Sequence, residues 1–149
     1  MLIFYKEQVR VIDMVYRIFL VEDDYLLAKV IAEQLSYDNY EVIQPNSFKT
    51  IDREIIQQEP DLVLLDLQLP YDDGYQICRR VREKSKIPII IISARNQDFE
   101  QMLALEIGAD DYVTKPFSPE LLHIKIRAVI RRIYGEDAKK ENTQIYKGL

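Results

Sequence analysis

Short apolar runs alternate with amphipathic stretches along most of this chain. Residues 18–21, 62–65 and 88–92 form continuous apolar runs, and weaker strand-like segments cover residues 40–44 and 111–114. Runs of this length without polar alternation favour strands that are buried on both faces, as in a parallel sheet covered by helices. The pattern therefore predicts five strands.

Helical periodicity fills the intervals between these runs. Leu27, Val30, Ile31 and Leu35 recur at the spacing of one helix face, which predicts a first helix after Asp24. The other helices are predicted around residues 51–56, 74–83 and 99–107, and from residue 118 onward. Capping and breaking residues mark their ends: Asn46 or Ser47 before the second helix, Asp73 before the third, Gly108 after the fourth, and Pro119 in the first turn of the fifth.

Five strands that alternate with five helices indicate an α/β fold with a parallel sheet. Because crossover connections between parallel strands are right-handed, few topologies remain. We predict a flavodoxin-like (βα)5 three-layer sandwich, in which the five-stranded parallel sheet has the order 2-1-3-4-5.

The two ends of the chain fall outside this alternation. We assign residues 15–134 to one domain and residues 1–14 to an N-terminal extension of uncertain origin. Residues 135–142 are polar and charged, as in a linker, whereas residues 143–149 show strand-like alternation. Residues 135–149 are therefore expected to be a linker and the start of a truncated C-terminal domain.

Composition narrows the classes of function. The net charge of -5 argues against nucleic-acid binding by this segment, because phosphate contacts require an excess of Lys and Arg. A single cysteine, Cys78, fits a reducing compartment. No apolar run approaches the roughly 20 residues of a membrane span. We therefore expect a cytoplasmic protein that does not contact the membrane.

Polar residues follow the ends of the predicted strands. Glu22 and Asp23 follow the first strand, Asp66 the third, Ser93 the fourth and Lys115 the fifth. In an open parallel sheet, ligands bind beyond the carboxyl ends of the strands where the strand order reverses, here between the first and third strands. Glu22, Asp23 and Asp66 are therefore expected to converge.

Three converging carboxylates repel one another unless a cation lies among them. Mg²⁺ suits such a site because it is a hard cation that binds carboxylate, water and phosphate oxygens. Lys115 adds a compact positive charge, and Ser93 adds a hydroxyl donor. The set favours phosphoryl transfer onto a carboxylate, for which positioning and charge stabilisation suffice. Strand-end caps and surface charges would explain each residue alone but not the whole set.

The motifs at these strand ends resemble the response-regulator receiver domain over roughly residues 16–133. They are FLVEDD at 19–24, LLDLQLP at 64–70, Gly74, ISAR at 92–95 and GADDYVTKPF at 108–117, in the order and spacing of that family. Residues 109–119 and the pair Arg131-Arg132 are typical of its winged-helix (OmpR/PhoB-type) branch. Residues 69–79 and 93–96 are also similar to regulators of peptide-antibiotic resistance.

The resemblance implies that Asp66 is the phosphoacceptor for a sensor histidine kinase. It also implies that Asp23, Asp66 and the backbone carbonyl of Gln68 bind Mg²⁺ directly, with Glu22 acting through water. Asp24 is expected to cap the first helix and not to bind the metal.

Lys115 is implied to pair with phosphoryl oxygens, and its bond to Pro116 is implied to be cis. Ser93 and Tyr112 match the switch pair of the family. In that pair the hydroxyl moves to the phosphate and the aromatic ring rotates inward. An alternative for Tyr112 is a partly exposed ring that packs on the fourth helix.

The winged-helix branch dimerises through its fourth helix, fifth strand and fifth helix. The resemblance implies a phosphorylation-dependent homodimer with two cross-subunit ion pairs: Glu106 with Arg127, and Asp111 with Lys125. Gln101 and Leu121 occupy the positions of a third usual pair, which implies a more apolar contact. Residues 145–149 resemble the first strand of the branch's DNA-binding domain, so DNA contact is expected only through that missing domain.

Two other functions stay open from the residues alone. A receiver-like scaffold would signal by protein contact without phosphorylation, but it would have no need to keep Asp66 and Lys115. A flavodoxin-like enzyme is disfavoured because Glu22 would repel a flavin phosphate. An aspartate-nucleophile phosphatase is disfavoured because Gln68 stands where it has a second acid. With no separate substrate, we expect self-phosphorylation and autodephosphorylation and no other enzymatic activity.

Overall fold

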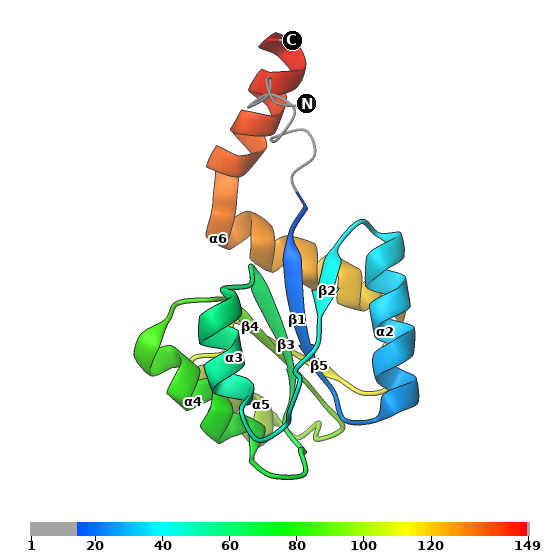
Figure 1. The fold of residues 1–149 in the computed structure, drawn as a ribbon, viewed down its shortest axis with the longest axis vertical. Coiled ribbons are helices and arrows are strands. Elements are labelled where there is room, and N and C mark those ends of the chain that lie inside the picture. The colour runs from blue at the N-terminus through cyan, green and yellow to red at the C-terminus, as the bar shows by residue number, and fades with distance from the viewer. Residues whose placement is uncertain (1–14, 149) are drawn as a thin grey trace.

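A parallel sheet of five strands forms the middle layer of the molecule (Figure 1). The computed structural model describes residues 15–148, with side chains through residue 135. The strand order is β2-β1-β3-β4-β5, which confirms the predicted flavodoxin-like topology. The strands are β1 (Arg17–Val21), β2 (Glu41–Ile43), β3 (Leu62–Asp66), β4 (Ile89–Ser93) and β5 (Asp111–Thr114).

Helices cover both faces of the sheet. They are α2 (Tyr25–Tyr37), α3 (Ile51–Gln58), α4 (Gly74–Lys84), α5 (Asp98–Glu106) and α6 (Pro119–Gly148). The core cluster on one face joins the strands to α2 and α6, and the cluster on the other face joins them to α3, α4 and α5. These clusters make the three layers seen in Figure 1.

The apolar runs form strands because both faces of the sheet are covered. Along β1, Ile18 and Leu20 belong to the cluster with α2 and α6, whereas Phe19 and Val21 belong to the opposite cluster. All four side chains are fully buried. A strand that buried only one face would instead alternate apolar and polar residues.

Helix starts follow the predicted caps at two places. The Asp24 carboxylate accepts the backbone N–H of Leu27 at 3.2 Å, and the Asp73 carboxylate accepts that of Tyr75 at 2.8 Å. Both contacts satisfy N–H groups that lack a partner in the first helical turn.

The predicted cap of the second helix is wrong. Neither Asn46 nor Ser47 caps α3, which begins at Ile51 with Thr50 as its N-cap residue. The backbone N–H groups of Asn46 and Ser47 instead donate to the carboxylate of Glu54, at 2.8 and 3.2 Å. The Ser47 carbonyl accepts the backbone N–H of Thr50, so residues 47–50 form a turn before the helix.

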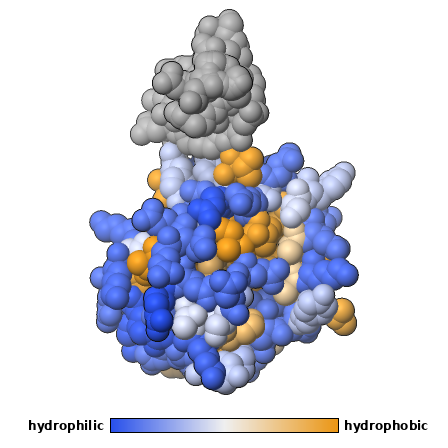
Figure 2. Space-filling view, viewed as in Figure 1, coloured by the Kyte–Doolittle hydropathy of each residue, from blue (hydrophilic) through white to orange (hydrophobic). Residues whose placement is uncertain are grey.

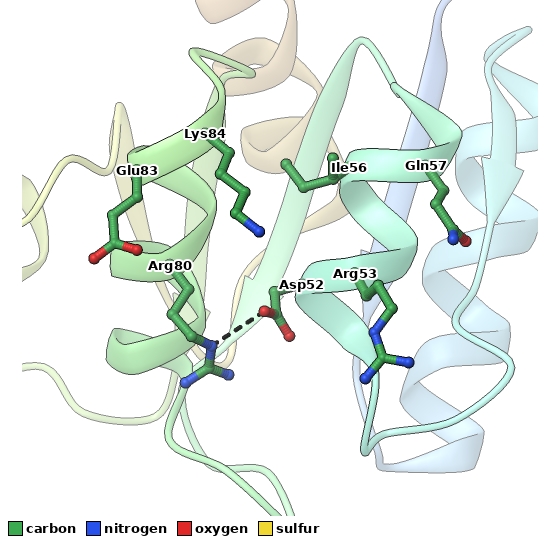
Figure 3. A pocket seen from close by; sticks show the side chains of 7 residues that line it. All are labelled: Asp52, Arg53, Ile56, Gln57, Arg80, Glu83 and Lys84. Carbon is green, nitrogen blue, oxygen red and sulfur yellow. Dashed lines mark hydrogen bonds and ion pairs between the residues drawn. The ribbon is translucent and has the colours of Figure 1, made fainter.

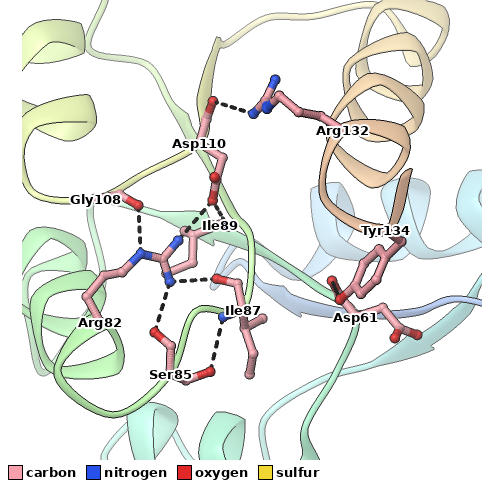
Figure 4. Close-up of polar contacts among 9 residues, drawn as sticks. All are labelled: Asp61, Arg82, Ser85, Ile87, Ile89, Gly108, Asp110, Arg132 and Tyr134. Carbon is pink, nitrogen blue, oxygen red and sulfur yellow. Dashed lines mark hydrogen bonds and ion pairs between the residues drawn. The ribbon is translucent and has the colours of Figure 1, made fainter. Parts of the chain in front are cut away.

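Arg82 links the end of α4 to the segments that lead into β4 and β5 (Figure 4). Its guanidinium donates to the carbonyl oxygens of Gly108 at 2.8 Å and Ile87 at 2.6 Å, and pairs with Asp110 at 2.9 Å. The same Asp110 carboxylate accepts the N–H of Ile89 at 2.8 Å. One side chain therefore fixes the amino-terminal edge of the sheet, opposite the predicted site.

The last part of the chain departs from the predicted pattern. The helical backbone of α6 runs to Gly148, with a non-helical residue at Gly135 (φ 69°, ψ -162°). The strand-like alternation at the end of the chain does not form a strand over residues 143–148, which are helical. The assignment of residues 135–149 to a linker and a further domain stays a prediction. The expected extension at residues 1–14 lies outside the described residues.

Tyr134, directly before the non-helical Gly135, holds α6 on the sheet. Its hydroxyl donates to the carbonyl oxygen of Asp61 at 2.7 Å (Figure 4). Its ring stacks on Tyr16 with centroids 5.7 Å apart. Replacing Tyr134 by Phe removes only the hydroxyl, so we expect the free energy of unfolding to fall by about 1 kcal/mol. Urea unfolding followed by circular dichroism measures this loss. An unchanged midpoint and slope would show that the hydrogen bond does not contribute to stability.

The face drawn in Figure 2 is largely hydrophilic, with apolar surface between α3 and α2, where the short edge strand β2 lies. None of the helices in the described part of the chain has the length and hydropathy needed to cross a membrane.

Candidate functional site

The predicted acidic cluster forms at the carboxyl edge of the sheet. β1 and β3 are hydrogen-bonded neighbours with Val21 opposite Leu65, so the residues that follow lie beside each other. Glu22, Asp23 and Asp66 each place a carboxylate oxygen within 4.8 Å of the others. Glu22 and Asp66 are buried, whereas Asp23 is exposed.

Backbone contacts hold two of these carboxylates in place. The N–H of Asp24 donates to Glu22 at 3.0 Å, and the N–H of Gln68 donates to Asp66 at 3.3 Å. Clustered oxygens with an exposed member fit a hard cation such as Mg²⁺, which keeps several of its waters. The predicted ligand role of the Gln68 carbonyl stays a prediction.

Lys115 brings a positive charge into this cluster. Its Nζ lies 2.7 Å from Oε1 of Glu22 and 3.1 Å from Oδ2 of Asp66. Its backbone N–H donates to the Ser93 carbonyl at 2.7 Å, and its peptide bond to Pro116 is cis. The sequence predicted a positive charge from Lys115 among these carboxylates, but not that its shorter contact would be with Glu22.

The charges at this edge shift one another's titration. Burial raises the pKa of Glu22 above its ordinary value, and the nearby charge of Asp66 adds to this, although Lys115 and the N–H of Asp24 oppose the rise. Burial alone would lower the pKa of Lys115, but its contacts with Glu22 and Asp66 outweigh burial and raise it. Lys115 therefore stays charged at neutral pH.

Ser93 and Tyr112 lie at the same edge of the sheet. In the β3–β4 pair Asp66 is opposite Ile92, so fully buried Ser93 lies one residue further along. Its Oγ accepts the backbone N–H of Arg95 at 3.1 Å. Tyr112 is 5% exposed, and its hydroxyl donates to the Arg95 carbonyl at 2.5 Å. The ring of Tyr112 is therefore in an inward position in this structure.

The residues predicted for a dimer contact lie along α5, β5 and α6. Lys125 lies 3.2 Å from Asp111 within one chain. The arrangement of such pairs across subunits stays a prediction. The other four differ in exposure: Glu106, Arg127 and Leu121 are exposed, and Gln101 is half-buried.

A contact between α4 and α5 was not predicted. The hydroxyl of Tyr75 donates to the Glu100 carboxylate at 2.5 Å and lies 3.2 Å from the Glu100 carbonyl oxygen. Arg95 lies over the Tyr75 ring, 5.9 Å from its centroid, and 3.6 Å from Glu100. The only signal in the sequence is a tyrosine directly after Gly74, at a position that packs in the core.

A small cleft of about 210 Å³ lies between α3 and α4 (Figure 3). It shares no lining residue with the acidic cluster. Arg80 spans it, donating to Asp52 at 3.1 Å and also to Asp72. These contacts neutralise Arg80 within the chain, and the remaining charges that line the cleft, on Arg53, Lys84 and Glu83, are of both signs.

The fold and the site together define a doubly wound α/β domain with an acidic, lysine-containing cluster at its switch point. Residues 18–127 match the family model described as the response regulator receiver domain. The chain therefore belongs to the response-regulator receiver family.

Curated relatives point to regulators of transcription. The chain is 47% identical over 121 residues to the uncharacterised transcriptional regulatory protein YvcP of Bacillus subtilis, covering 81% of this chain and 51% of that protein. It is 38% identical over 130 residues to the sensory transduction protein BceR of Halalkalibacterium halodurans, covering 87% and 55%. The chain thus spans about half the length of these relatives.

Solved structures agree with the fold and the family. The receiver domain of Klebsiella pneumoniae RstA, activated with BeF3, superposes with a TM-score of 0.73 at 34% identity, covering 77% of this chain and 98% of that one. The N-terminal domain of the nisin resistance regulator NsrR, a lantibiotic response regulator, gives 0.72 at 37% identity, covering 78% and 98%.

Proposed function

We propose that this chain is a phosphorylation switch in which Asp66 accepts a phosphoryl group from a sensor histidine kinase. The observation that carries the proposal is the meeting of Glu22, Asp23 and Asp66 with Lys115 at the switch point of the sheet. In the transfer, the bond between phosphorus and the kinase histidine nitrogen breaks. A bond from phosphorus to a carboxylate oxygen of Asp66 forms, giving an acyl phosphate.

Each residue of the cluster has a distinct part in this transfer. Asp23, Asp66 and the backbone carbonyl of Gln68 would hold Mg²⁺, with Glu22 acting through water. When bound, the ion neutralises the carboxylates and the oxygens of the transferred group. Lys115 is already 3.1 Å from Asp66 and would pair with a phosphoryl oxygen.

Ser93 and Tyr112 would change position when Asp66 is phosphorylated. The Ser93 hydroxyl would donate a hydrogen bond to a phosphoryl oxygen. The Tyr112 ring would be in its inward position when this hydrogen bond is made. Both groups contact Arg95, so movement at one affects the other. The acceptor is a side chain of the domain itself, so the chemistry is self-phosphorylation and autodephosphorylation without a separate substrate.

We further propose that phosphorylation promotes a homodimer through α5, β5 and α6. This face carries exposed apolar side chains that a partner subunit would cover: Phe99, Met102, Leu105, Leu121 and Ile124. The ion pairs expected across the dimer are Glu106 with Arg127 and Asp111 with Lys125. Gln101 and Leu121, at the positions of the third usual pair, would make the contact more apolar than in other members of the branch.

The output of the switch is proposed to be control of transcription by a winged-helix DNA-binding domain beyond this segment. Support comes from the relatives, which are regulatory proteins of which this chain covers only 51% and 55%. Likeness to the nisin resistance regulator supports a place among regulators of peptide-antibiotic resistance. We expect the protein to act in the cytoplasm, where a kinase and DNA are both accessible.

The direct test is incubation with a small phosphodonor and Mg²⁺, followed by intact-protein mass spectrometry. One phosphoryl adduct per chain is expected, and it should require Mg²⁺. If the folded protein gains no adduct from either the small donor or its natural kinase, the proposal is wrong and a phosphorylation-independent scaffold becomes the better interpretation.

Mg²⁺ itself is expected to stabilise the fold. At ten times its Kd, a cation that binds only the folded state raises the free energy of unfolding by about 1.4 kcal/mol. Asp23→Asn should remove most of this gain because it deletes the exposed carboxylate of the cluster. Asp98→Asn, which changes an exposed acid at the start of α5, should retain it. Urea unfolding with and without Mg²⁺ at constant ionic strength measures the difference; equal gains in both variants would contradict the site.

A further inference from the structure

The connection between β4 and α5 is held by tyrosines from two other elements. Tyr112 of β5 donates its hydroxyl to the Arg95 carbonyl at 2.5 Å. Tyr75, in the first turn of α4, donates its hydroxyl to the Glu100 carboxylate at 2.5 Å. Tyr75 and Tyr112 belong to the same core cluster, so their rings pack in one apolar region while their hydroxyls fix the two ends of this connection.

Arg95 joins the two tyrosines to the predicted switch hydroxyl. Its backbone N–H donates to Ser93 Oγ at 3.1 Å, its carbonyl accepts from Tyr112, and its guanidinium lies 3.6 Å from Glu100. The same guanidinium lies over the Tyr75 ring. Because Arg95 contacts Glu100, Ser93 and Tyr112, a displacement of Glu100 would also move the groups that Ser93 and Tyr112 bind.

The hydrogen bond from Tyr75 to Glu100 is stronger than one between two neutral groups. Tyr75 is 8% exposed, and a hydrogen bond from a buried hydroxyl to an ionised carboxylate is about twice as strong as one between neutral groups. Burial raises the pKa of Tyr75, and Glu100 raises it further, so the phenol keeps its proton as a donor. Tyr75 also follows Gly74, whose N–H donates to the Leu67 carbonyl next to the phosphoacceptor position.

We propose that Tyr75 is a positioning residue, which together with Glu100 forms a latch that holds the β4–α5 connection and keeps Tyr112 inward. This inference deepens the proposed switch and rests on it for its functional consequence. The latch ties the phosphoacceptor loop, which precedes α4, to the first turn of α5. Its release would loosen the segment that carries Arg95, displace the carbonyl that accepts the Tyr112 hydroxyl and lower the population of the inward ring.

The first test needs no phosphoryl chemistry. Tyr75→Phe keeps the buried ring and removes the hydroxyl, so hydrogen exchange in residues 94–101 is expected to accelerate by about 3- to 10-fold. The ring resonances of Tyr112 should shift toward a more exposed environment. Glu100→Gln keeps a carbonyl acceptor for Tyr75 and should show a smaller change. Tyr134→Phe removes a comparable hydroxyl contact at the other end of the sheet and should leave this segment unchanged.

The second test measures the link to the site with beryllofluoride and Mg²⁺ as the probe. Tyr75→Phe is expected to weaken beryllofluoride binding by about 3- to 10-fold, with Glu100→Gln between it and wild type. Unchanged exchange in residues 94–101 of Tyr75→Phe would overturn the latch. Altered exchange with wild-type affinity would overturn its coupling to the site. If wild type itself neither binds beryllofluoride nor accepts a phosphoryl group, the proposed function fails, while the exchange data still decide on the latch.

Discussion

Asp66→Asn is expected to abolish phosphorylation of this chain. The carboxylate of Asp66 is buried at the switch point, 3.1 Å from Lys115, and is the proposed nucleophile. An amide of the same shape presents no carboxylate oxygen to form an acyl phosphate. Intact-protein mass after incubation with a small phosphodonor and Mg²⁺ should therefore show one adduct for wild type and none for the variant.

A control is needed because the variant also removes one charge from an acidic cluster. Asp24→Asn removes a charge from a neighbouring residue whose carboxylate caps α2, and asparagine is an equally good cap. This control should accept a phosphoryl group as wild type does. An adduct that persists in folded Asp66→Asn would place the acceptor elsewhere, with Asp23 as the next carboxylate to test.

Most of the sheet could be predicted because strands that are buried on both faces appear in the sequence as uninterrupted apolar runs. Ile18 and Phe19 point to opposite faces and are both fully buried, so no polar residue interrupts the run. The acidic cluster was predictable for a related reason: parallel strands bring their carboxyl ends to one edge. Because the predicted order makes the first and third strands neighbours, Glu22 and Asp66 at their carboxyl ends were expected to lie close together.

Contacts between side chains far apart in the sequence were not predictable in the same way. Ser47 is a good capping type, but its N–H binds Glu54, seven residues later, and the helix begins beyond it. Tyr75 and Glu100 are 25 residues apart on different helices. No spacing rule connects such residues, because their contact depends on how α4 and α5 pack.

Gly74→Ala is expected to have the largest effect on stability among the variants considered. A Cβ at this position would lie 2.4 Å from the Asp66 carbonyl oxygen and 2.7 Å from the Leu67 Cα. Both are backbone atoms, so no side-chain rotation relieves the overlap, and the loop that carries the phosphoacceptor must move. We expect the free energy of unfolding to fall by about 3 kcal/mol, the upper part of the usual range for overpacking. Urea unfolding followed by circular dichroism measures this loss.

Gly135→Ala separates this steric effect from the general cost of replacing a glycine. Gly135 has a positive φ of 69°, but an added Cβ would meet nothing within 4 Å. With ψ at -162° this is a conformation that almost only glycine adopts, so its replacement should cost about 1–3 kcal/mol from backbone strain alone, without steric overlap. Because the overlap at Gly74 displaces the Asp66 backbone, phosphoryl uptake by Gly74→Ala should also be slower under conditions where the variant is fully folded. Wild-type stability and phosphoryl uptake of Gly74→Ala would mean that the α4 start can shift freely, and that the position of Asp66 does not depend on this glycine.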